Sequence, residues 1–542
     1  MEKNMMRSSF AVGIAATLAA GFSAAPTALG QEEADQRFGT VHFATSCNET
    51  AQRRFDRAMR YQHSFWYQSS KEIFEDVLKA DPECGIAQWG IALSLLFNPH
   101  APPPATSLPL GLAAIEKGKT VGAKSQHERD YIDALSAMYV DYDKVPHRTR
   151  VLAYLKAMEA LAARYPDDDE AQILYAIMLN VAASPSDKTY ANQLKGAAIL
   201  EPIFKRQPRH PGVAHYLIHL YDSPALAEKG LDAAKRYAAI APAAPHAQHM
   251  PSHIFTRVGY WKDSIASNTA SARSAKDGKV FDEELHALDY MVYAHLQLGQ
   301  DQKAESIVAE MKGVTGADRF PGIYAHAAGP ARYAMERGDW TGAAGLQVRP
   351  SNLHYPDAMT HFVRALGAAR SGNPEAAKAD IVKLAELREK LRDAKDGYWT
   401  GQVDIQWQVA TAWVLYAEGK YDEALKAMSA AASAEDATDK HPVTPGVATP
   451  ARELYGQMLL ERGMATEALA AFEATLAKVP HRLGAEIGAA KAAEKMGDAA
   501  KARAHYAAVV ALGEAADPVR PDIAYARAFM TKSQVRELRA SR

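Results

Sequence analysis

Apolar and polar positions follow the period of an α-helix along almost the whole chain. From residue 50 onward, apolar residues recur at spacings of three and four, without the two-residue alternation typical of a strand. Glycine and proline fall at the ends of these apolar runs, where helices stop. The pattern therefore predicts an all-α protein built from many short helices.

A longer repeat is superimposed on the helical period. A glycine is followed by small or apolar residues at offsets of five, nine and twelve, as in Gly419-Ala424-Met428-Ala431, Gly463-Ala468-Phe472-Thr475 and Gly497-Ala502-Tyr506-Val509. Gly463 and Gly497 are 34 residues apart. Glycine permits a sharp turn, the small residue lets two helices approach, and the aromatic residue packs on the next unit.

This period and these offsets resemble the tetratricopeptide repeat family, whose unit is a pair of antiparallel helices. The resemblance implies an all-α, tetratricopeptide-like solenoid of helical hairpins wound into a superhelix, because one unit alone cannot bury its apolar face. It covers most of residues 50–515, is strongest in 463–510 and is poor in 97–150. The phrases HYLIH and APHAQHMPSHIF, with the Cys-to-Cys arm, resemble a group of exported bacterial repeat proteins to which no activity can be attached.

Breaks in the pattern divide the chain into segments. We predict a signal peptide at 1–30, an arm with the first helical pair at 31–97, irregular repeats at 98–209, His-rich repeats at 210–326, C-terminal repeats at 327–515, and a tail or capping helix at 516–542. Two Pro-rich stretches, 98–111 and 436–450, interrupt the helices. Long loops of a solenoid often reach over its groove, although a filler role is an equal alternative.

The first thirty residues have the order of an export signal. Lys3 and Arg7 precede an apolar run from Phe10 to Phe22, and Ala28-Leu29-Gly30 is a small-x-small cleavage site. No later run reaches the roughly 18 apolar residues of a membrane span. We therefore expect a secreted or periplasmic protein without a transmembrane segment in the mature chain. The two cysteines, Cys47 and Cys84, are candidates for a disulfide in that compartment, with two buried thiols as the alternative.

Histidines gather in the middle of the chain. Six lie between residues 210 and 254, and His215, His219 and Asp222 share one face of a predicted helix at spacings i, i+4 and i+7. Val213, Leu217 and Leu220 form a nearly opposite stripe. We expect the aliphatic stripe to pack into the solenoid and the His-His-Asp stripe to face away from that core.

A second histidine stripe follows it. His246, His249 and His253 are spaced i, i+3 and i+7, and counting back from Gly259 places them at groove positions of the repeat. The same count from Gly299 places His286, Asp289 and Tyr293 in that groove. Pro251 interrupts this stripe, so a helix starting near Pro251 would leave His246 and His249 in the preceding turn.

Neutral imidazole is the commonest ligand of transition metals, and two histidines at i, i+4 can share one ion. We therefore predict a zinc or copper ion bound by His215, His219, His246, His249 and His253, with Asp222 as a ligand or orienting group. No HExxH motif is present, which disfavours a standard zinc protease. The alternatives are a groove that binds a peptide or anionic ligand without metal, and a structural histidine network.

Three further residues are weaker candidates for the same groove. His42 and His63 could add ligands if the superhelix curls, with ordinary packing as the alternative, and Asp187 is either a polar groove contact or a helix N-cap. The net charge of −2 and the lack of a basic cluster give no reason to expect nucleic acid as a partner.

The leading hypothesis is metal-assisted binding of a protein, peptide or small ligand in the concave groove. A His-ligated hydrolase or oxidase and a plain assembly scaffold are the alternatives, and the sequence does not decide whether the protein is an enzyme.

Overall fold

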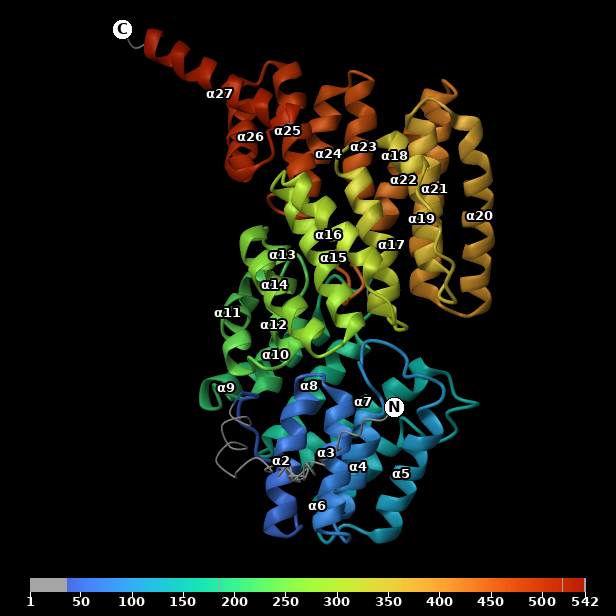
Figure 1. The fold of residues 1–542 in the computed structure, drawn as a ribbon, viewed down its shortest axis with the longest axis vertical. Coiled ribbons are helices and arrows are strands. Elements are labelled where there is room, and N and C mark those ends of the chain that lie inside the picture. Colours follow the sequence, from blue (N-terminus) through green and yellow to red (C-terminus); the bar gives the residue numbers. More distant parts are fainter. Residues whose placement is uncertain (1–36, 185, 519, 541–542) are drawn as a thin grey trace, which may run out of the picture.

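The computed structural model describes residues 37–184, 186–518 and 520–540, and in these ranges the chain is helical without strands (Figure 1). Antiparallel helices stack from the N-terminal to the C-terminal end of an elongated, curved molecule. The predicted all-α solenoid of tetratricopeptide-like hairpins is confirmed. The predicted signal peptide at 1–30 lies outside the described residues. Among the helices described, none combines the length and apolarity needed to cross a bilayer.

The N-terminal helices surround a core rich in aromatic side chains, in which Phe55, Phe74 and Trp89 are fully buried. Phe55 and Phe74 meet edge to face with ring centroids 5.1 Å apart. The helices of this part are α2 (Glu49–His63), α3 (Tyr67–Ala80), α4 (Gly85–Ser94), α5 (Leu108–Val121), α6 (Gln126–Ser136), α7 (His147–Arg164), α8 (Asp169–Ala182) and α9 (Ala191–Arg206).

The central helices are shorter and include a break at a proline. One helix ends at His249 and the next begins at Pro251, so the sequence-based expectation of a helix start there is confirmed. The elements are α10 (Pro211–Tyr221), η1 (Ala227–Gly230), α11 (Leu231–Ile240), α12 (Pro245–His249), α13 (Pro251–Arg257), α14 (Trp261–Asp277), α15 (Phe281–Gln297), α16 (Asp301–Gly313), α17 (Phe320–Met335) and α18 (Trp340–Ala344).

The C-terminal helices follow the repeat most regularly. The fully buried ring of Phe472 fits against Gly456 and Gly488, where a Cβ on Gly488 would lie only 2.3 Å from the ring. The elements are α19 (Tyr355–Arg370), α20 (Pro374–Asp393), α21 (Gly397–Ala417), α22 (Tyr421–Asp436), α23 (Ala451–Glu461), α24 (Ala465–Lys478), α25 (Leu483–Met496), α26 (Ala499–Leu512), η2 (Gly513–Ala515) and α27 (Pro521–Ala540).

The glycines of the repeat turn the chain between helices. All seven adopt a positive φ, between 65° and 86°, a region that side chains with a Cβ rarely enter. They are Gly259, Gly299, Gly338, Gly372, Gly419, Gly463 and Gly497. The glycine pattern in the sequence therefore marks real helix ends.

The C-terminal repeats pack back against the central ones through a buried ion cluster. The Arg482 guanidinium donates hydrogen bonds to Glu453 and Glu336, both at 2.5 Å, and to the Tyr293 hydroxyl at 3.2 Å. The Trp261 indole N–H donates to the His481 carbonyl at 2.8 Å. These contacts hold α25 beside α15, so distant parts of the sequence frame the centre of the molecule.

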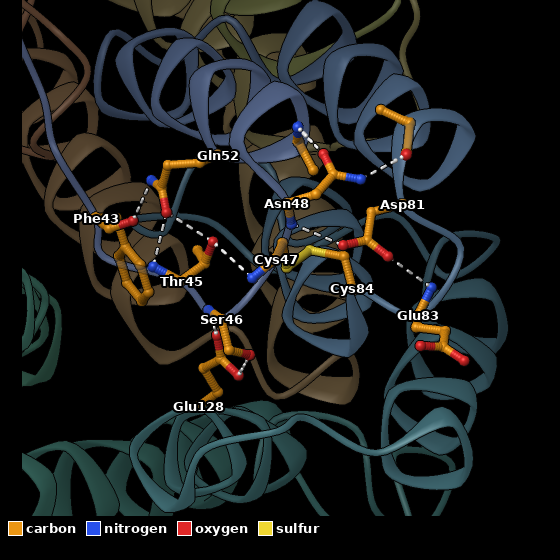
Figure 2. Close-up of a disulfide and its surroundings, with 12 residues drawn as sticks. Phe43, Thr45, Ser46, Cys47, Asn48, Gln52, Asp81, Glu83, Cys84 and Glu128 are labelled. Atoms are coloured by element: carbon orange, nitrogen blue, oxygen red, sulfur yellow. Dashed lines mark hydrogen bonds between the residues drawn. A yellow bond between two sulfur atoms is a disulfide. The ribbon is translucent and has the colours of Figure 1, made fainter.

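A disulfide joins Cys47 in the N-terminal arm to Cys84 at the start of α4 (Figure 2). Hydrogen bonds surround it: the Asn48 backbone N–H donates to Asp81 at 2.8 Å, and the Asn48 amide donates to the Ala80 carbonyl at 2.8 Å. The predicted Cys47–Cys84 pairing is confirmed. The bond and its neighbours fix the arm to the first helical hairpin.

Replacing Cys47 and Cys84 with serine should destabilise this end of the protein by roughly 3 to 4 kcal/mol, because the unfolded chain regains the entropy of an open loop. The cysteines are 37 positions apart in the sequence. Hydrogen exchange followed by mass spectrometry should show faster exchange in α2 to α4 and unchanged exchange in α19 to α22. Equal exchange in the two proteins would contradict a stabilising role of the bond.

Candidate metal centre

Four helices, α10, α12, α13 and α15, bring imidazoles together in the centre of the molecule. His215 and His219 lie on α10, which begins with Pro211 at its first turn and is capped by the His210 side chain accepting from Val213 N. Every residue of α10 is buried. The aliphatic stripe packs into the core, as expected, but the histidine stripe is not left open: Phe65 and the rings of His246 on α12 and His253 on α13 cover it, so it lines an internal site.

The first trio consists of His215, His219 and His246. The Nε2 atom of His215 lies 3.1 Å from Nε2 of His219 and 3.1 Å from Nε2 of His246. Two imidazole nitrogens bound to a tetrahedral ion at about 2.0–2.1 Å are about 3.3 Å apart. The three rings thus have the spacing of ligands that share one ion, and they form a possible ligand set.

The second trio consists of His249, His253 and His286. Nε2 of His249 lies 2.9 Å from Nε2 of His253, and the ring centroids of His249 and His286 are 4.2 Å apart. Ligand atoms of the three residues lie within 4.8 Å of one another. The turn between α12 and α13 therefore aligns His249 and His253 as an i, i+4 pair, and α15 supplies the third ring.

Hydrogen bonds at Nδ1 fix the tautomers of His249 and His253. Nδ1 of His253 lies 2.9 Å from a carboxylate oxygen of Asp222, which can only accept. Nδ1 of His249 lies 2.6 Å from Oδ1 of Asn268, whose amide nitrogen donates to the Ser264 carbonyl at 2.8 Å. Both Nδ1 atoms therefore carry the proton.

In neutral imidazole only one ring nitrogen carries a proton. The two Nε2 atoms of His249 and His253 thus present lone pairs to each other at 2.9 Å, where no hydrogen bond can join them. An electron-pair acceptor between them, such as a metal ion, would turn this repulsive contact into a stabilising one.

The first trio has the same arrangement on His215. Its Nδ1 donates to the backbone carbonyl of His63 at 2.7 Å, which leaves the lone pair on Nε2. Nδ1 of His246 lies 3.5 Å from a carboxylate oxygen of Glu283, and neither atom has a hydrogen-bond partner. Nε2 of His215 therefore lies beside two other ring nitrogens, and its single lone pair can accept a hydrogen bond from only one of them.

Burial favours the neutral form of five of these rings, and this is the form in which imidazole binds metal. It lowers the pKa of His215, His219 and His249 far below the ordinary value. The pKa of His253 falls to about 4, because burial outweighs the hydrogen bond from its ring to Asp222, and burial lowers that of His286 to about 3.

Asp222 stays ionised in the buried region beside the second trio. Burial alone raises the pKa of a carboxyl, but Lys440 and Arg257 outweigh it and lower the pKa of Asp222 far below its usual range. Lys440 Nζ lies 2.7 Å and Arg257 Nε 2.7 Å from its oxygens. This carboxylate orients the His253 ring, as such groups do around bound metals.

A third group, His63, Glu170 and His210, also has ligand spacing. Its hydrogen bonds are complete, however: Tyr216 OH is 3.0 Å from Nδ1 of His63, and each Nε2 lies within 2.9 Å of Glu170. Nδ1 of His210 accepts from the Val213 N–H, so Nε2 carries its proton. This group is a satisfied structural network that holds α2, α8 and α10 together, with the His63 carbonyl serving the first trio.

A cleft of about 430 Å³ leads from the surface to the first trio. Both Pro-rich loops line it, with His100 and Pro102 from the first and Asp439 to Pro442 from the second, and His219 and Asp222 line it as well. The His100 ring lies tilted against His219, with centroids 4.5 Å apart. The loops thus reach the site, and a small molecule in the cleft could contact an ion held by His219.

The other predicted site residues lie elsewhere. His42 is exposed and contacts Asp56 at 2.9 Å, and Asp187 accepts from Thr189 near the surface without capping α9. Asp289 and Tyr293 are buried, but they accept hydrogen bonds from Arg332 and Arg482 and have no contact with either trio among those described. His63 is the exception, since its backbone carbonyl supports His215.

Sequence analysis missed Glu283, Asn268, His100 and Lys440. A signal existed for Glu283, which lies three residues before His286 and so on the same helical face. His100 and Lys440 belong to the two Pro-rich loops, whose approach to the groove was expected without naming residues. Asn268 lies on α14 and carries no pattern that distinguishes it from a packing residue.

The metal-free protein should lose stability as the pH falls from 6.5 to 4. An unfolded histidine takes up its proton near pH 6.5, whereas buried His253 does so only near pH 4, so acid favours the unfolded chain in this window. This one ring accounts for about 3 kcal/mol when the window is crossed. Thermal melting of chelator-treated protein between pH 7.5 and 4.5 measures the effect. A constant midpoint down to pH 4.5 would contradict buried, neutral imidazoles.

Fold and site together define a helical-repeat protein with a buried polyhistidine centre. A scan against protein-family models gives no match, and a search of curated protein sequences gives none either. The chain is similar to solved helical structures at low identity.

One is the Cut9–Hcn1 hetero-tetramer of APC/C, with 10% identity over 89% of this chain and 95% of the other, and a TM-score of 0.29. A second is Naa15/Naa10 bound to HypK-THB, with 14% identity over 90% and 80% of the two chains and a TM-score of 0.19. A third is a monomeric IFIT1 mutant with a capped RNA, with 11% identity over 89% and 100% of the chains and a TM-score of 0.31. These likenesses are too distant to support any statement about the function of this chain.

Proposed function

We propose that this protein binds a transition metal through buried imidazoles and presents it to a small ligand in the adjoining cleft. The observation that carries the proposal is the pair of Nε2 lone pairs of His249 and His253, which face each other at 2.9 Å while both Nδ1 atoms donate elsewhere. A buried histidine network without metal would give each such nitrogen a hydrogen-bond partner, as the Glu170 carboxylate does for Nε2 of His63 and of His210.

The donor set favours zinc or copper. All the ligands are neutral nitrogen atoms, which suit zinc, copper or nickel, whereas calcium and magnesium require oxygen ligands. The carboxylates of Asp222 and Glu283 stand behind His253 and His246, where they increase ligand basicity and offset the charge of the ion. Glu283 is ionised. Burial raises its pKa, but the contact with His246 counters this rise and helps to bring the pKa down to about 2.

Elemental analysis of the purified full-length protein tests metal binding directly. We expect tightly bound zinc or copper that survives gel filtration, and its return when chelator-treated protein is incubated with either ion alone. Protein that takes up no Zn²⁺, Cu⁺, Cu²⁺ or Ni²⁺ under these conditions would overturn the proposal. The remaining hypothesis would then be a scaffold for protein assembly without a metal site.

Catalysis at the bound ion is a second candidate function. The cleft reaches His219, and three protein ligands leave a fourth position of a tetrahedral ion open to water or substrate, as in catalytic zinc sites. Azide binding to the cobalt- or copper-loaded protein would show that this position is open. A spectrum unchanged by azide would favour a closed, purely metal-storing site.

Export to an oxidising compartment is part of the same proposal. The Cys47–Cys84 disulfide is compatible with it, and metal uptake there would not compete with cytoplasmic thiols. Determining the N-terminal residue of the protein purified from its natural host tests the signal peptide, with Gln31 expected as the first residue. An intact Met1 on the mature protein would contradict export.

A further inference from the structure

One short helix contributes a ligand to each trio. α12 is five residues long, and it carries His246 of the first trio and His249 of the second, one turn apart. The centroids of these two rings are 6.1 Å apart, and those of His219 and His253 are 6.0 Å apart. The two trios are therefore neighbours, joined by the same turn of backbone.

We propose that the two trios hold two metal ions side by side, as one dinuclear centre with three imidazoles on each ion. This inference rests on the proposed metal-binding function and specifies its site. A ring centroid lies about 3 Å from an ion bound at its Nε2. Rings of different trios that are about 6 Å apart can thus belong to adjacent ions, which in two-metal sites are about 3.5–4 Å apart.

A single ion shared by all six rings does not fit the geometry. Six nitrogens bound at about 2.1 Å would all lie within about 4.2 Å of one another. In the structure, ligand atoms within 4.8 Å of one another form two sets of three and do not merge into one set of six. Two centres of convergence, each with the spacing of one ion's ligands, are therefore present.

The two trios are also built alike. Each contains an i, i+4 pair, His215 with His219 and His249 with His253, and a third ring from another element. In each pair, one ring donates from Nδ1 to a neutral oxygen: His215 to a backbone carbonyl at 2.7 Å, and His249 to the Asn268 amide at 2.6 Å. Both rings are held with Nε2 toward the centre.

Each trio has one buried carboxylate behind it. Asp222 holds His253 in the second trio, and Glu283 faces His246 in the first, with side chains only 4% and 23% exposed. The Glu283 carboxylate oxygen has no hydrogen-bond partner, and neither has Nδ1 of His219. Because Asp222 already pairs with Lys440 and Arg257, Glu283 is the carboxylate left to offset the charge of the ions, which repel each other at this distance.

The dinuclear centre is tested by measuring the number of metal ions per chain in variants that each lack one histidine of one trio. Full-length wild type, H219Q and H286Q are stripped with chelator, reloaded separately with Zn²⁺ and with Cu²⁺, and desalted. We expect about two ions per chain in wild type and about one in each variant. H42Q serves as the control, because His42 is exposed and distant from the centre, and it should keep both ions. Far-ultraviolet circular dichroism checks that each variant is folded.

Electron paramagnetic resonance of the copper-loaded proteins tests whether the ions are adjacent. Two neighbouring Cu²⁺ ions couple, so wild type should show less signal than its copper content predicts, whereas H219Q and H286Q should show the full signal of one isolated ion.

Each outcome decides between the proposals. One ion per chain in wild type, lost in both variants, would overturn the pair and leave the metal-binding function standing. Two ions that persist in H219Q and H286Q would place metal elsewhere and overturn the pair. No metal in wild type would overturn both proposals.

Discussion

Replacing His215 and His249 together with alanine should remove all bound metal and leave the helical content unchanged. These residues are the best-oriented ring of each trio, with Nδ1 held by the His63 carbonyl and by Asn268. Without them each trio keeps two ligands, fewer than the three protein ligands with which zinc sites hold their ion. The effect on metal content should therefore be the largest of any double substitution in the protein. Elemental analysis after gel filtration measures it.

The matched control replaces two histidines outside the centre. His42 and His505 are paired with carboxylates at 2.9 Å and 2.6 Å, on the N-terminal arm and on α26. H42A/H505A should retain full metal occupancy. Occupancy that stays complete in the His215/His249 double variant, or that falls equally in the control, would refute the assignment of the trios.

Asp222→Asn should have the largest effect on stability. This side chain accepts from Arg257 and Lys440 and from the His253 ring, and it is 4% exposed. Asparagine keeps the shape but removes the charge, which leaves two cations buried without their counter-ion. Breaking such a buried pair costs about 3 to 5 kcal/mol. Urea denaturation of the metal-free proteins should show this loss.

The same substitution should also weaken metal binding about 10- to 100-fold, because the His253 ring loses its charged partner. Competition with a chelator of known affinity measures the change. The control is Asp436→Asn, whose side chain is 30% exposed and pairs with Arg452 and Lys478 at the surface. It should change stability by no more than about 1 kcal/mol. Similar losses in the two variants would contradict a special role for Asp222.

Lys440 gives the Asp222 prediction a second readout. Burial lowers the pKa of its ammonium group to about 8, and Asp222 opposes that shift. Without the carboxylate the pKa of Lys440 falls further, so the variant should hold one proton fewer at neutral pH than wild type. Comparing the pH dependence of stability between pH 7 and 9 shows the difference.

The fold could be predicted from the sequence because the residues that form and end each helix of a repeat lie close together in the chain. The glycines of the repeat sit at positive φ at the predicted helix ends, and Phe472 packs between small residues as its offset indicates. The disulfide followed from the number of cysteines. Long-range contacts such as Arg482 with Glu336 and Glu453 were not accessible, because nothing in a repeat pattern says which distant units meet.

The histidine centre was only partly accessible. Spacing along the chain identified the pairs His215–His219 and His249–His253 and the turn at Pro251. It did not assign His246 and His249 to different trios, because that depends on how α12 lies between α10 and α15. The spacing also placed the histidine stripe of α10 away from the aliphatic core without showing that other elements cover it, and α10 is buried on every side. Periodicity shows which residues share a face but not what covers it.

The loop between α22 and α23 has a consequence for how the protein matures. Its residues contact much earlier parts of the chain: Lys440 binds Asp222, 218 positions before it, and the Val443 carbonyl accepts from Tyr290, 153 positions before it, at 3.2 Å. During synthesis the histidines emerge long before this segment does. The centre is therefore complete only when this later segment has packed against Asp222 and Tyr290. If the proposed ion is bound, its exchange with solvent is expected to require movement of this loop away from Asp222.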